Sequence, residues 1–449
     1  MITFPLLLIY AYAVLGLIFK PRLILYSFPV LALFDNTRLL VLSPSEVAQI
    51  GIIAIVFSSN LGDGCSSVKE LIPKFLVVLI LYCTWIFFDF LFHLLAQGDA
   101  PFFDMLKDTM KAVLGFFFVL SCRSFIRSER DLQIITKSLL IGFVCAISGA
   151  LVYMIIKGDP MALRASQNVL IATEGVNGTI LRNPNHYSRY LYFAFPFLIA
   201  ALRISTPKVR TWIYTLMIIA SVTILTTVSR MAFLMMIMIL IVTSFAYGKW
   251  RIIVFGVFAL ALIMLLLGDV TAKMEERFSK LQDLEDQNRI VMLAFSLHLI
   301  ADNPVFGTGP GSFNQLMAQS GLFANLPDSG KAAHNNFVFL AVQFGILASV
   351  LLGSVLLLLV WWFWRRRRSI YGMNHFSLAG FTTILAFAGA GMTAVVMGSD
   401  QFWFLLAVLY AAQGKTFLDA PRRRQFSESP GGGGPDIISP STWVLEGAV

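Results

Sequence analysis

The side chains best suited to chemistry lie in two polar segments between long apolar runs. One segment ends with Arg182 and Asn185, and the other carries Arg289, Lys331 and His334. A guanidinium group stays charged at any physiological pH and can bind phosphate oxygens through two parallel hydrogen bonds. Histidine, with an ordinary pKa of about 6.5, is the natural general base. These residue types predict an anion-binding site beside a proton acceptor.

The elements that position these residues are predicted to be membrane helices. Of the 449 residues, 57% are hydrophobic and 13% are charged, and a soluble domain of this length could not bury so much apolar surface. Runs long enough to cross a membrane lie near residues 3–19, 46–60, 74–96, 109–121, 133–156, 186–202, 211–228, 231–247, 252–268, 336–364, 377–397 and 400–413. They predict an all-α polytopic membrane protein with about twelve transmembrane helices. Leu23–Phe34 is shorter and contains Pro29, so we interpret it as re-entrant or partly buried.

Basic residues predict the orientation, because they cluster in every second connection and such clusters stay in the cytoplasm. The clusters are Arg203 with Lys208 and Arg210, Lys249 with Arg251, Arg365–Arg368, and Arg422–Arg424. This pattern also places Arg123, Arg127 and Arg130 inside, and the N-terminus too if Leu23–Phe34 does not cross. Lys20 and Arg22 then lie outside, against the rule. The net charge of +9 therefore reflects topology, and no module that reads nucleic acid is visible.

Two connections on the outer side are long, at residues 157–185 and 269–335, and we expect both to be periplasmic. They belong to a transmembrane catalytic domain, residues 1–413. Residues 414–449 contain a glycine run and are predicted to form a disordered cytoplasmic tail. The four cysteines lack the spacing of metal ligands, and neither a metal nor a cofactor is predicted.

The larger outer loop is predicted to be partly helical. Ile290–Ile300 is mostly apolar and is expected to lie at the membrane interface. The turn Gly307-Thr308-Gly309-Pro310-Gly311 cannot continue a helix and is expected to expose backbone N–H groups. His334-Asn335 follows where the next membrane helix begins.

In this order, these residues resemble the bacterial O-antigen ligase superfamily, which also contains the lipid-linked O-antigen polymerases and the protein O-oligosaccharyltransferases. The resemblance rests on Arg289 and Leu293 in an Arg-x-x-x-Leu arrangement, Asn303-Pro304 with Gly307, Gly309 and Gly311, His334-Asn335, Gly345, Asn183-Pro184-Asn185 and Ser229-Arg230. Ala348 stands where the ligase pattern has a second helix glycine. The match is most like the ligase.

The resemblance implies a GT-C-like membrane glycosyltransferase in the bacterial inner membrane, with its active site facing the periplasm. It would move a glycan from an undecaprenyl pyrophosphate carrier to a hydroxyl acceptor, the lipid A core or another glycan, without a metal. His334 would be the general base and Arg289 the second catalytic residue. Arg230, Arg289 and Arg182 would bind the diphosphate, and Asn335, Asn185, Gly309 and Lys331 would support the site.

Structural alternatives remain open for each of these residues. Arg230 could snorkel at a helix end, and Arg182 could cap a helix. Arg289 could pair with Asp286 or Glu285. His334 could be a hydrogen-bonded interface residue, whereas His93, His186, His298 and His375 are assigned no functional role. Two further functions also remain open: a polymerase of the same superfamily, and a transporter or flippase of a lipid-linked substrate. A transporter should place its charges near the midplane on broken helices.

Overall fold

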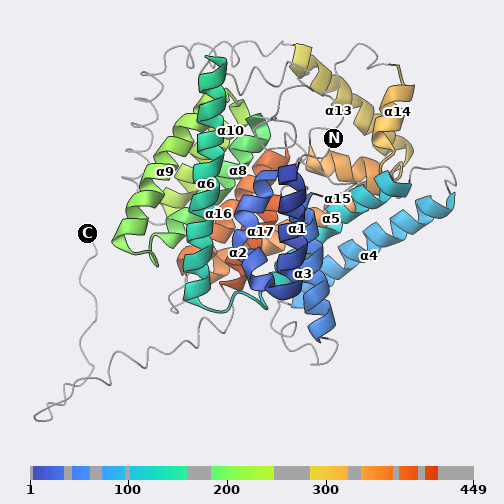
Figure 1. The fold of residues 1–449 in the computed structure, drawn as a ribbon. Coiled ribbons are helices and arrows are strands. Elements are labelled where there is room, and N and C mark those ends of the chain that lie inside the picture. The colour runs from blue at the N-terminus through green and yellow to red at the C-terminus, as the bar shows by residue number, and fades with distance from the viewer. Residues whose placement is uncertain are drawn as a thin grey trace, which may run out of the picture. The chain divides into compact units, whose positions relative to one another are not determined.

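The computed structural model describes residues 4–34, 43–60, 73–96, 102–158, 184–246, 284–321, 335–367, 374–392 and 400–412 (Figure 1). In these ranges every regular element is helical. The chain divides into two units, Met1–Leu418 and Asp419–Val449. The predicted tail after residue 413 and the predicted span 252–268 lie outside the described residues.

The helices follow the apolar runs of the sequence, and each predicted span within the described ranges coincides with one of them. Their bounds are α1 Phe4–Phe19, α2 Pro21–Leu31 with the short 3₁₀ turn η1 Ala32–Phe34, α3 Pro44–Asn60, α4 Pro73–Ala96, α5 Phe102–Cys122, α6 Glu129–Lys157, α8 Pro184–Ala201, α9 Pro207–Thr226, α10 Arg230–Ala246, α13 Leu284–Asp302, α14 Phe313–Gln319, α15 Asn336–Arg366, α16 Asn374–Gly391 and α17 Asp400–Ala411.

Four helical segments of the described chain are long and apolar enough to cross a membrane: Val77–Ala96, Glu129–Lys157, Pro207–Thr226 and Asn336–Arg366. Shorter apolar segments of 10–17 residues occur in α1, α3, α10, α13, α16 and α17. Many large apolar side chains on these helices remain exposed, among them Ile155 and Leu357. Since such a surface needs lipid around it, the protein is an α-helical membrane protein.

The connection between α8 and α9, which carries Arg203, lies beside the start of α6. The side-chain amide of Gln133 donates to the carbonyl oxygen of Ile204 at 3.1 Å. α6 itself begins with a capping box, in which the side chains of Ser128 and Asp131 each accept a hydrogen bond from the other's backbone N–H. The predicted cytoplasmic connections before α6 and after α8 therefore share one end of the helical unit.

Arg123 and Arg366 lie at this same end. The guanidinium of Arg123, which follows α5, lies 5.8 Å from the ring centre of Tyr410. Tyr410 packs against Trp362 with ring centroids 5.3 Å apart, and the guanidinium of Arg366 covers Trp362 at 4.4 Å. We call the end that holds Arg123, Arg203 and Arg366 the basic end.

Lys20 and Arg22 also lie near the basic end, which differs from the placement expected from the sequence. The Tyr26 hydroxyl, one turn into α2, donates to the Asp131 carboxylate at 2.7 Å. α2 then packs along α6. The expectation was wrong because α2 was judged too short to cross the membrane, whereas it runs beside the long membrane helix α6. Its basic start therefore lies on the same side as the other arginines.

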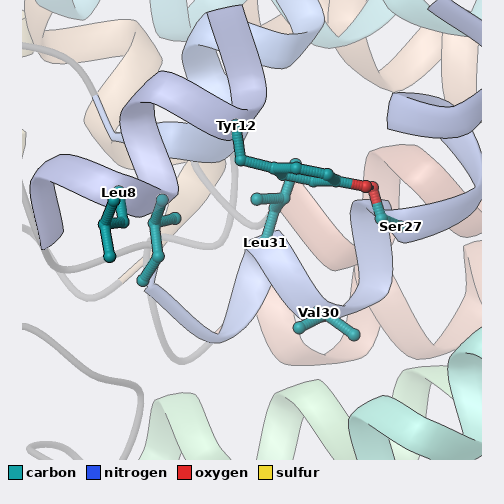
Figure 2. Close-up of a pocket in the computed structure, with 6 residues that line it drawn as sticks. Leu8, Tyr12, Ser27, Val30 and Leu31 are labelled. Carbon is teal, nitrogen blue, oxygen red and sulfur yellow. The ribbon is translucent and has the colours of Figure 1, made fainter. Parts of the chain in front are cut away.

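A shallow apolar hollow of about 220 Å³ lies between α1 and α2 (Figure 2). Its lining residues are Leu8, Ile9, Tyr12, Ser27, Val30 and Leu31. The Tyr12 hydroxyl donates to the Ser27 hydroxyl at 3.0 Å, so these two polar groups pair with each other. The apolar lining suits a lipid chain and offers little to a sugar.

α17 is enclosed by other helices. All twelve of its residues are buried, and it contacts α5, α8 and α16. Phe402 stacks on Phe387 of α16 with ring centroids 3.8 Å apart. Asp400 at its start accepts a hydrogen bond from the side chain of Gln49 at 2.9 Å. The main hydrophobic core is built around this helix.

Candidate functional site

α8 and α10 begin side by side, away from the basic end. Asn185, in the first turn of α8, accepts a hydrogen bond at Oδ1 from the Ser229 hydroxyl at 2.9 Å. Ser229 directly precedes α10, and its oxygen accepts from the N–H of Ala232 at 3.4 Å, which is the geometry of an N-cap. The two adjacent helix starts favour negative charge, because their first N–H groups lack partners within the helix.

Arg230 is the first residue of α10 and is half-buried. A tight turn fixes its position. Val228 has φ +49°, and in the described part of the chain it is the one residue other than glycine with positive φ. This conformation is costly for a β-branched side chain. The preceding Thr227 is fully buried and its hydroxyl donates to the Ile224 carbonyl at 2.6 Å. The strained turn holds Arg230 beside Asn185.

Asn335 connects the start of α15 to the end of α16. Its Oδ1 accepts from the backbone N–H of Phe337 at 2.8 Å and of Val338 at 3.2 Å, so it caps α15. Its Nδ2 donates to the carbonyl oxygen of Met392, directly after α16, at 3.2 Å. The chain position next to His334 is therefore fixed against the end of α16.

α15 is broken at Gly345, whose φ is +79° and ψ 168°. The glycine-rich turn of the outer loop packs into this break. A Cβ at Gly345 would lie 1.7 Å from the Val305 carbonyl oxygen, and a Cβ at Gly307 would lie 2.5 Å from the Val342 carbonyl oxygen. Backbone therefore lies directly against backbone, and only glycine permits this approach at the two positions.

Four hydrogen bonds join the turn to the broken helix. They run from Thr308 N to Val342 O (2.7 Å), from Gly309 N to Gln343 O (3.1 Å), from Thr308 Oγ1 to Val342 O (3.1 Å), and from Ile346 N to Pro304 O (2.9 Å). The sequence predicted that N–H groups of this turn would be exposed. Two of them instead pair with carbonyl groups that the break removes from the helix, so Gly309 has a docking contact with α15.

Aromatic and polar contacts with α4 anchor the same turn. Phe306 stacks on Phe92 with ring centroids 4.5 Å apart and on Trp85 with ring centroids 5.5 Å apart. His93 Nε2 lies 3.1 Å from the Phe306 carbonyl oxygen. The Trp85 indole N–H donates to the Phe344 carbonyl at 2.8 Å, again at the break. His93, to which the sequence analysis gave no role, is thus part of the docking surface.

Two carboxylates lie beneath the turn. Asp89 is completely buried, one helical turn from His93, with an Oδ1 to Nε2 distance of 3.7 Å. Asp108 of α5 accepts a hydrogen bond from the Gln343 side chain at 2.9 Å. Because buried polar groups are costly unless paired, the bond between Gln343 and Asp108 favours one position of the first part of α15 relative to α5.

The outer loop has a small hydrophobic core of its own. Met292 of α13, Phe313 and Met317 of α14, and Val342 of the first part of α15 form it. α13 and α14 lie together at one end of the unit (top right in Figure 1). The backbone of Arg289 belongs to α13, three residues before Met292. α13 and the helix that begins just after His334 therefore pack against each other.

The exposed side of α13 is apolar. The predicted helix is present, and its position at the membrane interface stays a prediction. Ile290, Leu293 and Leu297 are 66%, 40% and 53% exposed, whereas His298 and Asp302 near its end are polar and also exposed. An exposed apolar stripe on a helix at one end of a membrane protein suits the boundary between lipid and water.

The predicted site is described in part. Arg230, Asn185, Asn335 and Gly309 have the positions given above, whereas Arg182, Lys331, His334 and the side chain of Arg289 lie outside the described residues. The meeting of Arg230 with Arg289 thus stays a prediction. Among the described residues no group of three metal-ligating side chains could hold an ion. The fold also reveals a candidate that the sequence analysis missed, Arg189, which is buried four residues after Asn185 on α8. That spacing was the available signal.

Residues 215–353 match the family model described as O-Antigen ligase. The matched segment contains Ser229-Arg230, Arg289, the glycine-rich turn, His334-Asn335 and Gly345. No curated protein matches the chain. The likeness to the O-antigen ligase family rests on this segment, which supports a relation of the chain to that superfamily.

Proposed function

We propose that this protein is a membrane glycosyltransferase that moves a glycan from undecaprenyl pyrophosphate to a hydroxyl acceptor, with the lipid A core oligosaccharide as the leading acceptor. The observation that carries the proposal is the small outer core, which packs the helix of Arg289 against the helix that follows His334. The family match over residues 215–353 supports the same reaction class.

The proposed chemistry is a single displacement. His334 accepts the proton of the acceptor hydroxyl while that oxygen attacks the anomeric carbon from the face opposite the pyrophosphate. The bond between the anomeric carbon and the pyrophosphate oxygen breaks, and the carrier leaves with its electron pair. Arg230, Arg289 and Arg182 neutralise the charge that develops on it. The anomeric configuration inverts, and neither a metal nor a covalent intermediate is required.

The proposed setting is the inner membrane, with about twelve spans, a GT-C-like architecture and the loops 157–185 and 269–335 in the periplasm. The gathering of Arg123, Arg203 and Arg366 at one end supports this orientation. The starts of α8 and α10, with Arg230, then lie at the opposite, periplasmic end.

The break in α15 also allows a transporter to be considered, since broken helices carry the binding sites of many transporters. In such sites the freed carbonyl groups coordinate the coupling cation. Here the carbonyls of Val342, Gln343 and Phe344 accept hydrogen bonds from the outer turn and from Trp85. They are therefore occupied within the protein, which favours the transferase.

The test is a transfer assay on the purified full-length protein with carrier-linked glycan, alongside binding of the carrier pyrophosphate. We expect His334→Ala to lower turnover by ~10²–10⁴-fold with donor binding nearly intact. Arg289→Ala should weaken donor binding as well as turnover, and Arg289→Lys should restore little, because an ammonium cannot form the bidentate pair.

His298→Ala is the matched control, because His298 lies on the same loop and its side chain is 74% exposed. It should transfer glycan normally. Near-normal turnover by His334→Ala would remove that histidine from the chemistry. Running the assay with lipid A core and, separately, with a second carrier-linked glycan as acceptor distinguishes the ligase from a polymerase.

A further inference from the structure

A stripe of polar side chains runs along α8 from its first turn into the apolar part of the helix. Asn185, Arg189 and Tyr192 are four and three residues apart, so they share one face. Arg189 is 9% exposed and Tyr192 is fully buried. An ionised side chain buried within a membrane helix is costly, and such residues commonly mark a site for a charged ligand.

The Arg189 guanidinium turns back toward the start of α8. Its Nε donates to the Asn185 carbonyl oxygen at 3.0 Å. The side chain of the same Asn185 holds the Ser229 hydroxyl at 2.9 Å, and Arg230 follows in the chain. Two hydrogen bonds and one peptide bond therefore connect Arg189 with Arg230, and both arginines lie at the adjacent starts of α8 and α10.

The Tyr192 hydroxyl is a second, independent sign of a ligand. It is buried and has no hydrogen-bond partner among the described residues. Arg189 lies three residues earlier on the same face of α8. A buried hydroxyl without a partner is costly, and an oxygen of a bound ligand next to the guanidinium supplies one.

We propose that Arg189 binds one phosphate of the donor's diphosphate, with the Tyr192 hydroxyl donating to the same group, while Arg230 binds the other phosphate. The inference rests on the proposed function and extends it to a residue outside the matched segment. A diphosphate can engage both guanidinium groups, whereas a monophosphate engages one. The pair therefore gives the site its selectivity for a carrier that bears two phosphates.

The experiment compares two ligands on the full-length protein in lipid nanodiscs: undecaprenyl pyrophosphate and undecaprenyl monophosphate. The wild type should bind the diphosphate at least ~10-fold more tightly, since the second guanidinium adds at least one charge-assisted contact. Arg189→Gln should remove most of this preference by weakening diphosphate binding alone. Arg189→Lys should restore it partly, and Tyr192→Phe should reduce it by ~3–10-fold.

Arg210→Gln, at the exposed start of the neighbouring α9, is the matched control and should keep the wild-type preference. A structural role for Arg189 would weaken both ligands equally, and that result overturns the inference, as does equal binding of both ligands by the wild type. If Arg189→Gln fails to fold, an unchanged preference in Tyr192→Phe overturns it. Free inorganic pyrophosphate as a competitor shows whether the headgroup alone is recognised.

The two proposals fail differently. A wild-type protein that prefers the diphosphate through Arg189 but transfers no glycan to either acceptor contradicts the proposed function and supports the binding site. A protein that transfers glycan and binds the donor equally well with and without the Arg189 side chain supports the function and contradicts the site.

Discussion

Ser229 holds two helix starts together through one oxygen. Its hydroxyl hydrogen goes to Asn185 Oδ1, and its lone pair accepts the N–H of Ala232. Arg230 follows it directly, after a turn in which Val228 is strained. The position of Arg230, the predicted diphosphate-binding arginine, therefore depends on the small neutral side chain of Ser229. The residue type of Arg230 alone does not indicate this dependence.

Ser229→Ala should remove both contacts. We expect a loss of about 1 kcal/mol in the free energy of unfolding, the usual cost of an N-cap, and several-fold lower turnover because Arg230 is less firmly held. Thermal unfolding in detergent and the transfer assay measure the two effects. Ser221→Ala is the control, since that hydroxyl bonds the Met217 carbonyl of its own helix. Unaltered turnover in Ser229→Ala would show that this bond does not position the arginine.

α15 is a membrane helix whose interruption is completed by another part of the chain. A break normally leaves backbone carbonyl and N–H groups without partners inside the membrane. Here the outer turn provides those partners, and Phe306 fixes the turn on α4. The glycine-rich turn and the broken part of α15 consequently form one structural element, although Thr308 and its partner Val342 lie 34 residues apart in the chain.

Gly345→Ala should separate the glycine-rich turn from α15. The new Cβ would lie 1.7 Å from the Val305 carbonyl oxygen in a positive-φ conformation, so we expect a loss of at least ~2 kcal/mol and faster hydrogen exchange over residues 303–312. Gly353→Ala in the same helix is the control: its Cβ finds only Phe337, at 3.9 Å. That variant should be neutral or gain up to ~1 kcal/mol. Equal exchange in both variants contradicts the docking role.

The helices were predictable because hydrophobicity is a local property, and each apolar run within the described ranges forms a helix. The break at Gly345 was not, because its cause lies at Val305 and Phe306, far away in the sequence. The same reason explains His93, which was given no role until the fold brought Phe306 to it.

Prediction of the site was similarly divided. Motif order singled out Arg230 and Asn335, and the structure places both at helix starts. For Arg189 the sequence offered only its four-residue spacing from Asn185. An arginine inside an apolar run indicates a functional site only when its burial is known. The predicted placement of Lys20 and Arg22 was wrong because α2 was judged by its length. Its contact with α6 determines on which side its basic start lies.

At the scale of the whole molecule, the two ends of the helical unit differ in charge and in construction. The basic end gathers Arg123 and Arg366 on aromatic rings, with Arg203 in the connection that bonds the start of α6. The other end gathers the starts of α8 and α10 and the polar tie between Asn335 and Met392. This difference between the two ends suits a membrane protein whose substrates arrive from one side of the membrane.

Cysteine labelling tests the polarity directly in a background without the native cysteines. His298→Cys on the outer loop should react with a membrane-impermeant maleimide in cells whose outer membrane alone is permeable. Arg210→Cys at the start of α9 should react only after the inner membrane is opened. Both native side chains are exposed, so access alone decides the result. The reverse pattern would place the loop in the cytoplasm and end the functional proposal.

The enclosure of α17 has a consequence for biogenesis. At twelve residues it is about 18 Å long, well short of a hydrocarbon core of about 30 Å, and Asp400 and Gln401 open it. Such a segment partitions poorly into lipid by itself and is made after α5, α8 and α16, against which it packs. The ribosome therefore makes α17 only after these three helices, so the space between them must stay open until α17 inserts.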